Sequence, residues 1–280
     1  MLKKLELPGA GSMAWRINGE AILILGWGRA ILMQVAHPLV AEGVGQHSHF
    51  HTSPTAKARR LKQTLDTMLR MTFGTKNEAM GAAQGIDTIH GWVNGRLEQA
   101  TGQYAPVGLY YSARDPELLK WVHSTFVDSM LKTYELYVKK LSQAEKDQYL
   151  KETSVAAPML GAPADYFPVN TVELENYLNE MLHSGKIKVG GRGQSLADYV
   201  LAPLPIPVLG RFLRWYLSLP IVGLLPVSLR EAYNLRWGKL ESVTLNISAW
   251  VYRVLLRPWL PRQIYLWPMA RKAEKVSQSQ

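Results

Sequence analysis

Histidine is the residue type whose spacing first suggests chemistry. Four of the seven histidines fall within a short segment, at His37, His47, His49 and His51. Alternate side chains of an extended segment point to one side, so the last three imidazoles together with Glu42 would form a site for a first-row metal ion. The alternative is a loop that leads to a helix cap at Ser53, in which the imidazoles bond backbone groups of the turn.

A histidine further along the chain lies in an apolar pattern. His90 falls on a helical stripe with steps of three and four residues, formed with Ala83, Ile86, Val93 and Leu97. The pattern predicts that the imidazole of His90 faces an apolar interior. A single histidine in that position is ordinarily a core residue with its own hydrogen-bond partner, and the alternative is a metal ligand.

Polar residues on the preceding predicted helix favour the ligand interpretation. Arg60, Gln63 and Thr64 are spaced so that they share one helix face. A guanidinium and a hydroxyl directed inward would need an anionic or oxygen-rich partner. Haem provides both, through its propionates and an iron-bound oxygen ligand. The alternative for Arg60 is a solvated side chain beside Arg59.

Helix-start and helix-stop signals predict the elements that hold these residues. Ser53-Pro54 and Phe73-Gly74 bound a helix over residues 54–73, a second helix opens at residue 77, and a third runs from residue 116 towards residue 139. Two further helix starts are predicted by capping-box spacing. One pairs Ser142 with Glu145, and the other pairs Asn170 with Glu173. Few segments alternate with period two, so we expect an all-α fold.

The composition excludes several classes of protein. The 280 residues are 47% hydrophobic and 19% charged, which excludes disorder, and the absence of cysteine excludes disulfide scaffolds, zinc–thiolate sites, iron–sulfur clusters and cysteine nucleophiles. Two glycine patterns, at residues 9–14 and 26–28, suggest nucleotide loops. The first leaves no room for a preceding strand. The second follows a strand-like run, but Ile31 stands where a small residue must pack.

The positive charge is concentrated near one end of the chain. The net charge is +10, and residues 201–280 carry 11 Lys and Arg against three Glu, with five of the nine tryptophans. Because the cations are interleaved with rings, we expect peripheral membrane association and not nucleic-acid binding. The predicted face consists of Trp250, Tyr252, Arg253, Arg257, Trp259, Arg262, Tyr265 and Trp267. The alternative is a set of core aromatics with arginines on the outside.

No segment reads as a leader or a membrane span. The N-terminus lacks the apolar stretch of a signal peptide, and no uncharged apolar run reaches the roughly 18 residues of a spanning helix. We therefore expect a cytoplasmic protein, with membrane association at its surface. Five prolines between residues 203 and 226 predict short apolar helices there.

Several short motifs follow one another between Gly19 and Trp267. They are Gln34-Val-Ala-His-Pro38, Gly43-Val44, His47-Ser48, Arg60-Leu61-x-x-Thr64, Phe73-Gly74-Thr75, Ile89-His90-x-x-Val93-x-Gly95, Asp115-Pro116 and Trp121-Val122-His123. In this order they resemble the DUF2236 family, which includes rubber oxygenases (latex clearing proteins) and fungal MpaB-type oxygenases that shorten a farnesyl side chain. The resemblance covers most of the chain.

The resemblance implies an all-α fold with a globin-like helical bundle core that holds haem b, followed by a Pro-rich apolar C-terminal elaboration. His90 would be the proximal iron ligand, and Arg60 and Thr64 would match the family's Arg-x-x-x-Thr pair beside the haem. Gln63 and Asn94 stand where the rubber-cleaving branch has a lysine and an arginine. Glu42 would match the glutamate base of that branch. The two departures point away from polymer cleavage.

We therefore expect a haem b-dependent oxygenase that acts with O₂ on a hydrophobic unsaturated substrate, such as an isoprenoid or lipid chain. Arg60, Gln63 or Thr64 would orient bound oxygen, and Glu42 would take an allylic proton. One alternative is a non-catalytic haem- or lipid-binding helical protein at a membrane surface. A second is a non-haem metalloenzyme built on the histidines between residues 37 and 51. The expected division is an N-terminal extension (1–18), one helical domain (19–270) and a polar tail (271–280).

Overall fold

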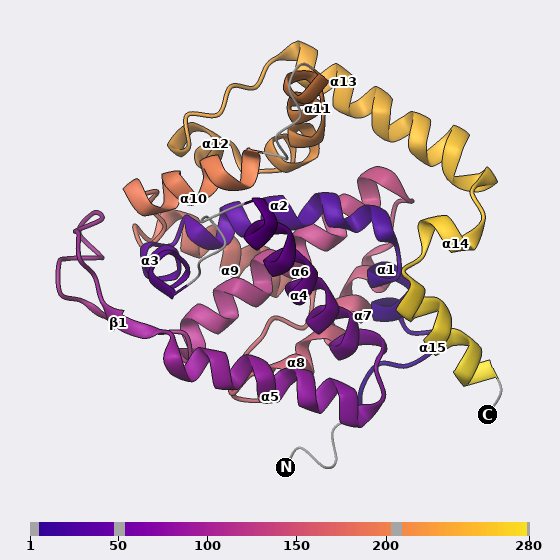
Figure 1. Cartoon of the computed structure of the whole chain (residues 1–280), viewed down its shortest axis with the longest axis horizontal. Coiled ribbons are helices and arrows are strands. Elements are labelled where there is room, and N and C mark those ends of the chain that lie inside the picture. The colour runs from indigo at the N-terminus through magenta and orange to yellow at the C-terminus, as the bar shows by residue number, and fades with distance from the viewer. Residues whose placement is uncertain (1–5, 48–53, 203–208, 279–280) are drawn as a thin grey trace.

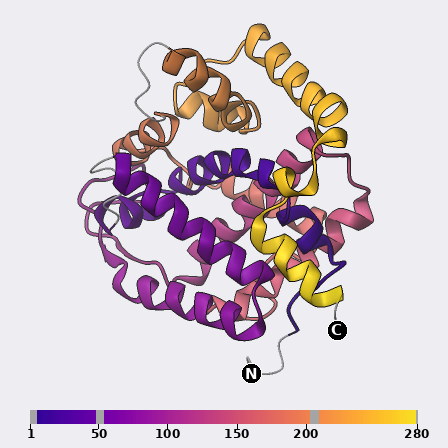
Figure 2. The ribbon, with the colours of Figure 1, turned by 45° about the vertical axis from the view of Figure 1, so that its right-hand side comes forward.

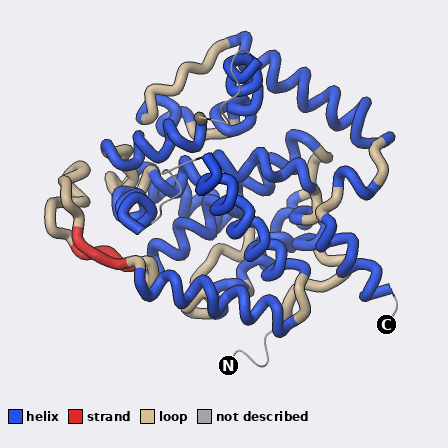
Figure 3. The backbone as a smooth tube through the Cα atoms, viewed as in Figure 1, coloured by secondary structure: helices blue, strands red, loops and turns tan. Residues whose placement is uncertain are grey.

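The computed structural model describes residues 6–47, 54–202 and 209–278, and these are mostly helical (Figure 1, Figure 3). The first helices are α1 (Met13–Asn18), η2 (Ala21–Leu23), α2 (Ile24–Val35), α3 (Pro38–His47), α4 (Pro54–Phe73), α5 (Lys76–Trp92), α6 (Pro116–Tyr137), α7 (Gln143–Ser154) and α8 (Ala156–Met159). They are followed by α9 (Thr171–His183), α10 (Gly191–Leu201), α11 (Leu209–Gly223), α12 (Val227–Ala232), α13 (Lys239–Trp250), η3 (Val251–Leu256), η4 (Arg257–Trp259), α14 (Arg262–Tyr265) and α15 (Pro268–Gln278). The all-α prediction is confirmed.

A single small sheet interrupts the helices of the described part. Strand β1 (Asn94–Arg96) pairs antiparallel with β2 (Tyr110–Ser112), so that Gly95 lies opposite Tyr111. This hairpin projects from one side of the molecule, next to the end of α5 (Figure 1). It returns the chain from α5 to the start of α6.

Helices α2 and α6 pack against each other at the centre of the core. Gly26 permits the close approach, because a Cβ at this position would overlap Thr133 Oγ1 on α6. Gly28 has the same effect towards α11, where a Cβ would overlap Ile221. The segment read as strand-like before Gly26 is therefore helical, and the glycines serve helix packing. Side chains at the centre include Ile17, Leu32, Met33, Trp121, Met130, Tyr149 and Tyr233.

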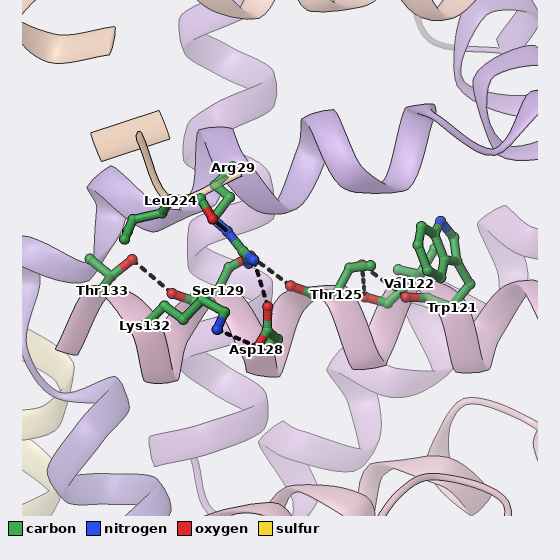
Figure 4. A network of polar contacts seen from close by, with 9 residues as sticks. All are labelled: Arg29, Trp121, Val122, Thr125, Asp128, Ser129, Lys132, Thr133 and Leu224. Atoms are coloured by element: carbon green, nitrogen blue, oxygen red, sulfur yellow. Dashed lines mark hydrogen bonds and ion pairs between the residues drawn. The ribbon is translucent and has the colours of Figure 1, made fainter. Parts of the chain in front are cut away.

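An arginine buried between these helices ties three parts of the chain together (Figure 4). The Arg29 side chain on α2 is 1% exposed and donates to Asp128 Oδ2 at 2.6 Å and to Ser129 Oγ at 2.6 Å, both on α6. Its Nε donates to the carbonyl of Leu224, after α11, at 2.7 Å. Lys132 lies 3.6 Å from the other carboxylate oxygen of Asp128. Each of the three guanidinium nitrogens of Arg29 thus has a partner on another element.

Most predicted helix starts are confirmed. Helix α4 has the bounds expected from its end signals, and α6 begins after Asp115, whose carboxylate accepts from Glu117 N–H at 2.9 Å. Ser142 and Asn170 cap α7 and α9 as expected. Helix α5 begins one residue earlier than predicted, because Thr75 is its cap and forms the capping box with Glu78.

The segment after α1 lies against the segment before α15 (Figure 2). Trp267 N–H donates to the carbonyl of Gly19 at 3.0 Å, and Arg257 pairs with the buried Glu20. The Arg257 guanidinium also stacks over the Tyr265 ring, 4.8 Å from its centroid. Arg257, Tyr265 and Trp267 therefore make internal contacts, and the lipid-facing role expected of them from the sequence stays a prediction.

The C-terminal helix completes the packing of α4. Trp15, Leu69, Phe73 and Ala270 form one apolar cluster, which joins α15 to the second half of α4. Helix α15 includes residues up to 278 that the sequence suggested as a polar tail. Among the described residues no single helix is long and apolar enough to cross a membrane, and only the bent pair Ala21–Val35 and Pro38–His47 passes by length and composition.

Candidate functional site

A helical hairpin positions His90. Helix α4 ends at Phe73 and α5 starts at Lys76, and Gly74 allows the turn because a Cβ there would collide with the Arg70 carbonyl. The Thr75 side chain accepts from Glu78 N–H at 3.3 Å, while Glu78 accepts from Thr75 N–H at 2.8 Å. This reciprocal cap fixes where α5 begins and hence where its last turn, with His90, lies.

The imidazole of His90 is half-buried and neutral. Burial is the main cause that lowers its pKa, and the cations Arg114 and Arg60 act in the same direction, against the opposite effect of Asp87. Its Nδ1 is buried and has no hydrogen-bond partner among the described residues. An unpartnered buried nitrogen is uncommon and is costly to leave unsatisfied. A neutral imidazole of this kind has the chemistry of a metal ligand.

The β hairpin brings a charged pair to the turn that carries His90. Its return strand places Arg114 beside α5, where the guanidinium binds both carboxylate oxygens of Asp87, at 2.9 and 2.8 Å. Arg114 also donates to the Asp87 carbonyl at 3.2 Å and covers Gly91. The helical stripe expected to continue through Val93 and Leu97 ends here, because α5 ends at Trp92 and β1 begins at Asn94.

The polar residues of α4 lie in the open. Arg60, Gln63 and Thr64 are all exposed, so the inward orientation expected from the sequence does not occur. The Thr64 hydroxyl donates to the Arg60 carbonyl at 2.9 Å. Residues 58–64 are exposed on every side of the helix, Leu61 included at 42%. Arg60 is among the cations that lower the pKa of His90, and α4 packs against α5.

Glu42 lies on a neighbouring helix, α3, with its side chain buried. It accepts from Gln46 Nε2 at 2.7 Å and pairs with Arg192 at 3.3 Å. It also lines a cavity of about 490 Å³ whose walls include Glu98, Lys188 and Arg192. Helix α3 approaches the residue after α5 through Gly43, where a Cβ would lie 3.2 Å from Val93 Cγ1. Glu42 and His90 thus belong to adjacent elements.

Asn94 and the early histidines have local roles. The Asn94 amide donates to the Gly91 carbonyl at 3.1 Å, which closes the end of α5. His37 and His47 stand at opposite ends of the ten-residue helix α3, about 15 Å apart by its rise per residue. They therefore cannot share a metal ion. Of the extended segment expected from His47 to His51, the structure describes only His47, at the end of α3. His49 and His51 lie outside the described residues.

No metal site emerges among the other acidic and histidine side chains of the described ranges, where no group of three or more such residues is close enough to hold an ion. His47 instead faces the Tyr111 hydroxyl, with 3.3 Å between Nε2 and the oxygen. Tyr111 also donates to Gln46 at 2.6 Å. The His47 ring therefore belongs to the polar surroundings of Glu42.

His37 makes the stability of the fold depend on pH. It is 1% exposed, and burial lowers its pKa to about 4, while Leu39 N–H donates to Nδ1 at 3.3 Å. The unfolded chain takes up a proton near pH 6.5 and the folded chain does not, so the stability falls as the pH falls from 6.5 towards 4. Between pH 7 and pH 5 we expect His37 to account for a loss of about 2 kcal/mol.

Urea unfolding at the two pH values measures this effect. In His37→Asn the amide oxygen can still accept from Leu39 N–H but does not titrate, so the loss between pH 7 and pH 5 should shrink by about 2 kcal/mol. The same replacement at the exposed His183 should leave the loss as in the parent protein. An equal loss in His37→Asn and the parent would contradict the assignment.

Sequence reasoning missed two ion pairs of the site. Asp87 stands three residues before His90 on the same helix, a spacing that could have identified it as a neighbour. Arg114 and Arg192 reach Asp87 and Glu42 from distant segments. No local pattern marks either arginine, because their positions depend on the β hairpin and on the packing of α10 against α3.

The family model for the "ER-bound oxygenase mpaB/B'/Rubber oxygenase, catalytic domain" matches residues 15–257. The chain belongs to this family. It is therefore an oxidoreductase of the oxygenase type, which uses O₂ and a small-molecule substrate. No curated protein and no solved structure matches the chain. The matched range of this oxygenase includes α3, α4, α5, β1 and α10, and thus Glu42, His90, Asn94 and the other candidate residues described above.

Proposed function

We propose that this oxygenase binds haem b and uses it with O₂ to cleave or oxidise a hydrophobic unsaturated substrate, an isoprenoid or a lipid chain. The observation that carries the proposal is the neutral, half-buried imidazole of His90, whose buried Nδ1 has no hydrogen-bond partner in the described part of the protein. Such an imidazole fits the proximal ligand position of a haem. When bound, haem supplies an iron centre at which O₂ can react with a carbon–carbon double bond.

The surroundings of His90 fit a large planar anionic group. The exposed segment 58–64 of α4 carries Leu61, which offers apolar contact, and Arg60, whose charge suits a propionate. The side chains of Ile89 and Trp92, which flank His90, are 49% and 78% exposed. Apolar area of this kind next to an imidazole is available to cover a porphyrin face. Asp87, held by Arg114, fixes the helical turn from which His90 projects.

The polar residues of α4 have a role on the substrate side in this proposal. Arg60, Gln63 and Thr64 lie on one exposed surface and can donate hydrogen bonds to an oxygen atom brought to it. Thr64 would exchange its hydrogen bond to the Arg60 carbonyl for one to that oxygen. Asn94 occupies a place close to the same turn of α5, where its amide can contact the cofactor edge.

Glu42 is the proposed base. Its carboxylate is held between Gln46 and Arg192 and borders a cavity, so it can accept a proton from a substrate carbon that reaches that space. We also propose a cytoplasmic location with peripheral membrane association, which suits an enzyme whose substrate dissolves in a bilayer. Glutamine at position 63 and asparagine at position 94 favour a small substrate over a polymer.

An oxygen-dependent assay tests the proposal. Protein loaded with haem is incubated with an unsaturated isoprenoid lipid in ¹⁸O₂, and we expect carbonyl products that carry the label. Glu42→Gln should lower the rate by roughly 10²–10⁴-fold, the range that a general base contributes, while leaving haem binding intact. A saturated chain of the same length serves as the substrate control. Haem binding without any labelled product would instead identify a non-catalytic haem carrier.

A further inference from the structure

Helix α13 and the turns after it carry a continuous stripe of exposed apolar side chains. The stripe consists of Leu240, Val243, Ile247, Trp250, Val254 and Trp259. Their exposed fractions range from 43% at Val254 to 83% at Trp259. The opposite side of the helix, with Leu245 and Ala249, is buried in the main core. The stripe therefore faces solvent because the helix already uses its other side for packing.

The stripe is long and lies at an edge of the molecule. From Leu240 to Trp250 it extends over about 15 Å, at the rise of an α-helix, and Val254 and Trp259 continue it onto η3 and η4. In two views the helix runs along the outer margin, away from α4 and α5 (Figure 1, Figure 2). Soluble monomers seldom expose large contiguous apolar areas, and such areas commonly mark interaction sites. A flat partner could cover the whole stripe without contacting the candidate active site.

Cations follow one edge of the stripe. Lys239 and Arg253 each precede a stripe residue, so both lie beside the stripe. Neither makes an ion pair with any described residue. Glu241 is the single carboxylate between residues 239 and 264. Its two oxygens accept hydrogen bonds from Gly238 N–H at 2.9 Å and from Trp215 Nε1 at 3.5 Å. The edge thus presents uncompensated positive charge.

We propose that the outer surface of α13, η3 and η4 docks the protein onto an anionic lipid bilayer. This inference rests on the membrane association proposed above and identifies the surface and the lipid charge responsible for it. Aliphatic side chains and tryptophan rings enter the boundary between headgroups and acyl chains, while lysine and arginine contact the anionic headgroups. The stripe combines these three features along a single helix edge.

The charges argue against a second copy of the chain as the partner. In a two-fold symmetric pair, the same surface meets itself. Parallel or antiparallel pairing of α13 with its copy would place Lys239 and Arg253 against the cations of the other copy, with no free carboxylate between them. An anionic bilayer neutralises the same charges. The surface also differs from the one expected from the sequence, since it includes Leu240, Val243 and Ile247 and excludes Arg257 and Trp267.

Co-sedimentation with sucrose-loaded vesicles tests the proposal. The full chain is mixed with vesicles of phosphatidylcholine alone or of phosphatidylcholine with phosphatidylserine. We expect stronger binding to the mixed vesicles, which decreases as salt is added. The double variant Ile247→Ser/Trp250→Ser should bind at least about tenfold more weakly. Lys239→Glu/Arg253→Glu should remove the preference for phosphatidylserine. Val172→Ser, at a residue of α9 that is 63% exposed, is the matched control and should bind like the parent.

Two results would overturn the docking surface. One is equal vesicle binding by Ile247→Ser/Trp250→Ser and the parent, with both shown to be folded by circular dichroism. The other is a dimer of the parent in size-exclusion chromatography with light scattering that the same variant converts to a monomer. Vesicle binding is measured with and without added haem. Failure of the surface is thus separable from failure of the haem proposal, which the visible spectrum of the same samples reports.

Discussion

Replacing Arg29 with methionine should lower the free energy of unfolding by about 3–5 kcal/mol, the usual cost of breaking a buried ion pair by removing one partner. The guanidinium satisfies Asp128, Ser129 and the Leu224 carbonyl, and Lys132 is the one other donor of the drawn network near Asp128 (Figure 4). The Asp128 side chain is only 11% exposed, so without Arg29 its negative charge would be buried. Lys132, 3.6 Å away and largely in solvent, would compensate that charge only in part. Urea unfolding monitored by circular dichroism measures the change.

Two further variants separate this pair from general effects of losing an arginine. Arg29→Met/Asp128→Leu removes both charges and should recover most of the stability, because the uncompensated carboxylate is gone. Arg262→Met breaks the exposed pair with Glu274 and should change the stability by less than about 1 kcal/mol. If Arg29→Met costs no more than Arg262→Met, the network does not hold α2, α6 and the end of α11 together.

Local sequence signals identified the helices that carry the candidate site because those signals act within a few residues. Pro54 at the first position of α4, the Asp115 cap and the Ser142 box each specify a helix start through near neighbours. The start of α5 shows the limit of this reasoning. Thr75 and Glu78 form the capping box, so α5 begins at Lys76. The start predicted at Asn77 is one residue too late.

Long-range packing explains what the sequence did not predict. The apolar steps beyond His90 suggested a longer helix, but the β hairpin ends α5 at Trp92 so that Arg114 can reach Asp87. Periodicity placed Arg60 and Thr64 on one face correctly, but it could not show that this face is exposed. The C-terminal aromatics likewise divide between internal contacts, as at Trp267, and an outer stripe, as at Trp259. That division follows from the anchoring of residues 257–267 on Gly19 and Glu20.

The second large effect is expected at His90. His90→Ala removes the residue proposed to bind the haem iron, so haem affinity should fall by more than the roughly 10–100-fold that loss of an outer-shell partner costs. The fold should be little affected, because the buried Nδ1 of the imidazole has no hydrogen-bond partner among the described residues that its removal would leave unsatisfied. His90→Gly with added imidazole should restore part of the binding. The lowered pKa of His90 further predicts that haem binding persists below pH 6.5.

His183→Ala is the matched control, because it removes an exposed histidine of α9 that lies outside the candidate site. Its haem affinity and thermal unfolding should equal those of the parent. Asp87→Asn tests the positioning of the same turn. It should weaken haem binding less than His90→Ala does. It should also alter the visible spectrum of the bound haem, because Arg114 then faces a neutral amide in place of the Asp87 carboxylate.

The most direct measurement is a titration of the purified full chain with haem, followed by its absorbance spectrum. The account predicts a saturable Soret band at one haem per chain, retained in His183→Ala and lost in His90→Ala. A parent protein that shows no Soret band on addition of haem, or a band of equal affinity in His90→Ala, would contradict it.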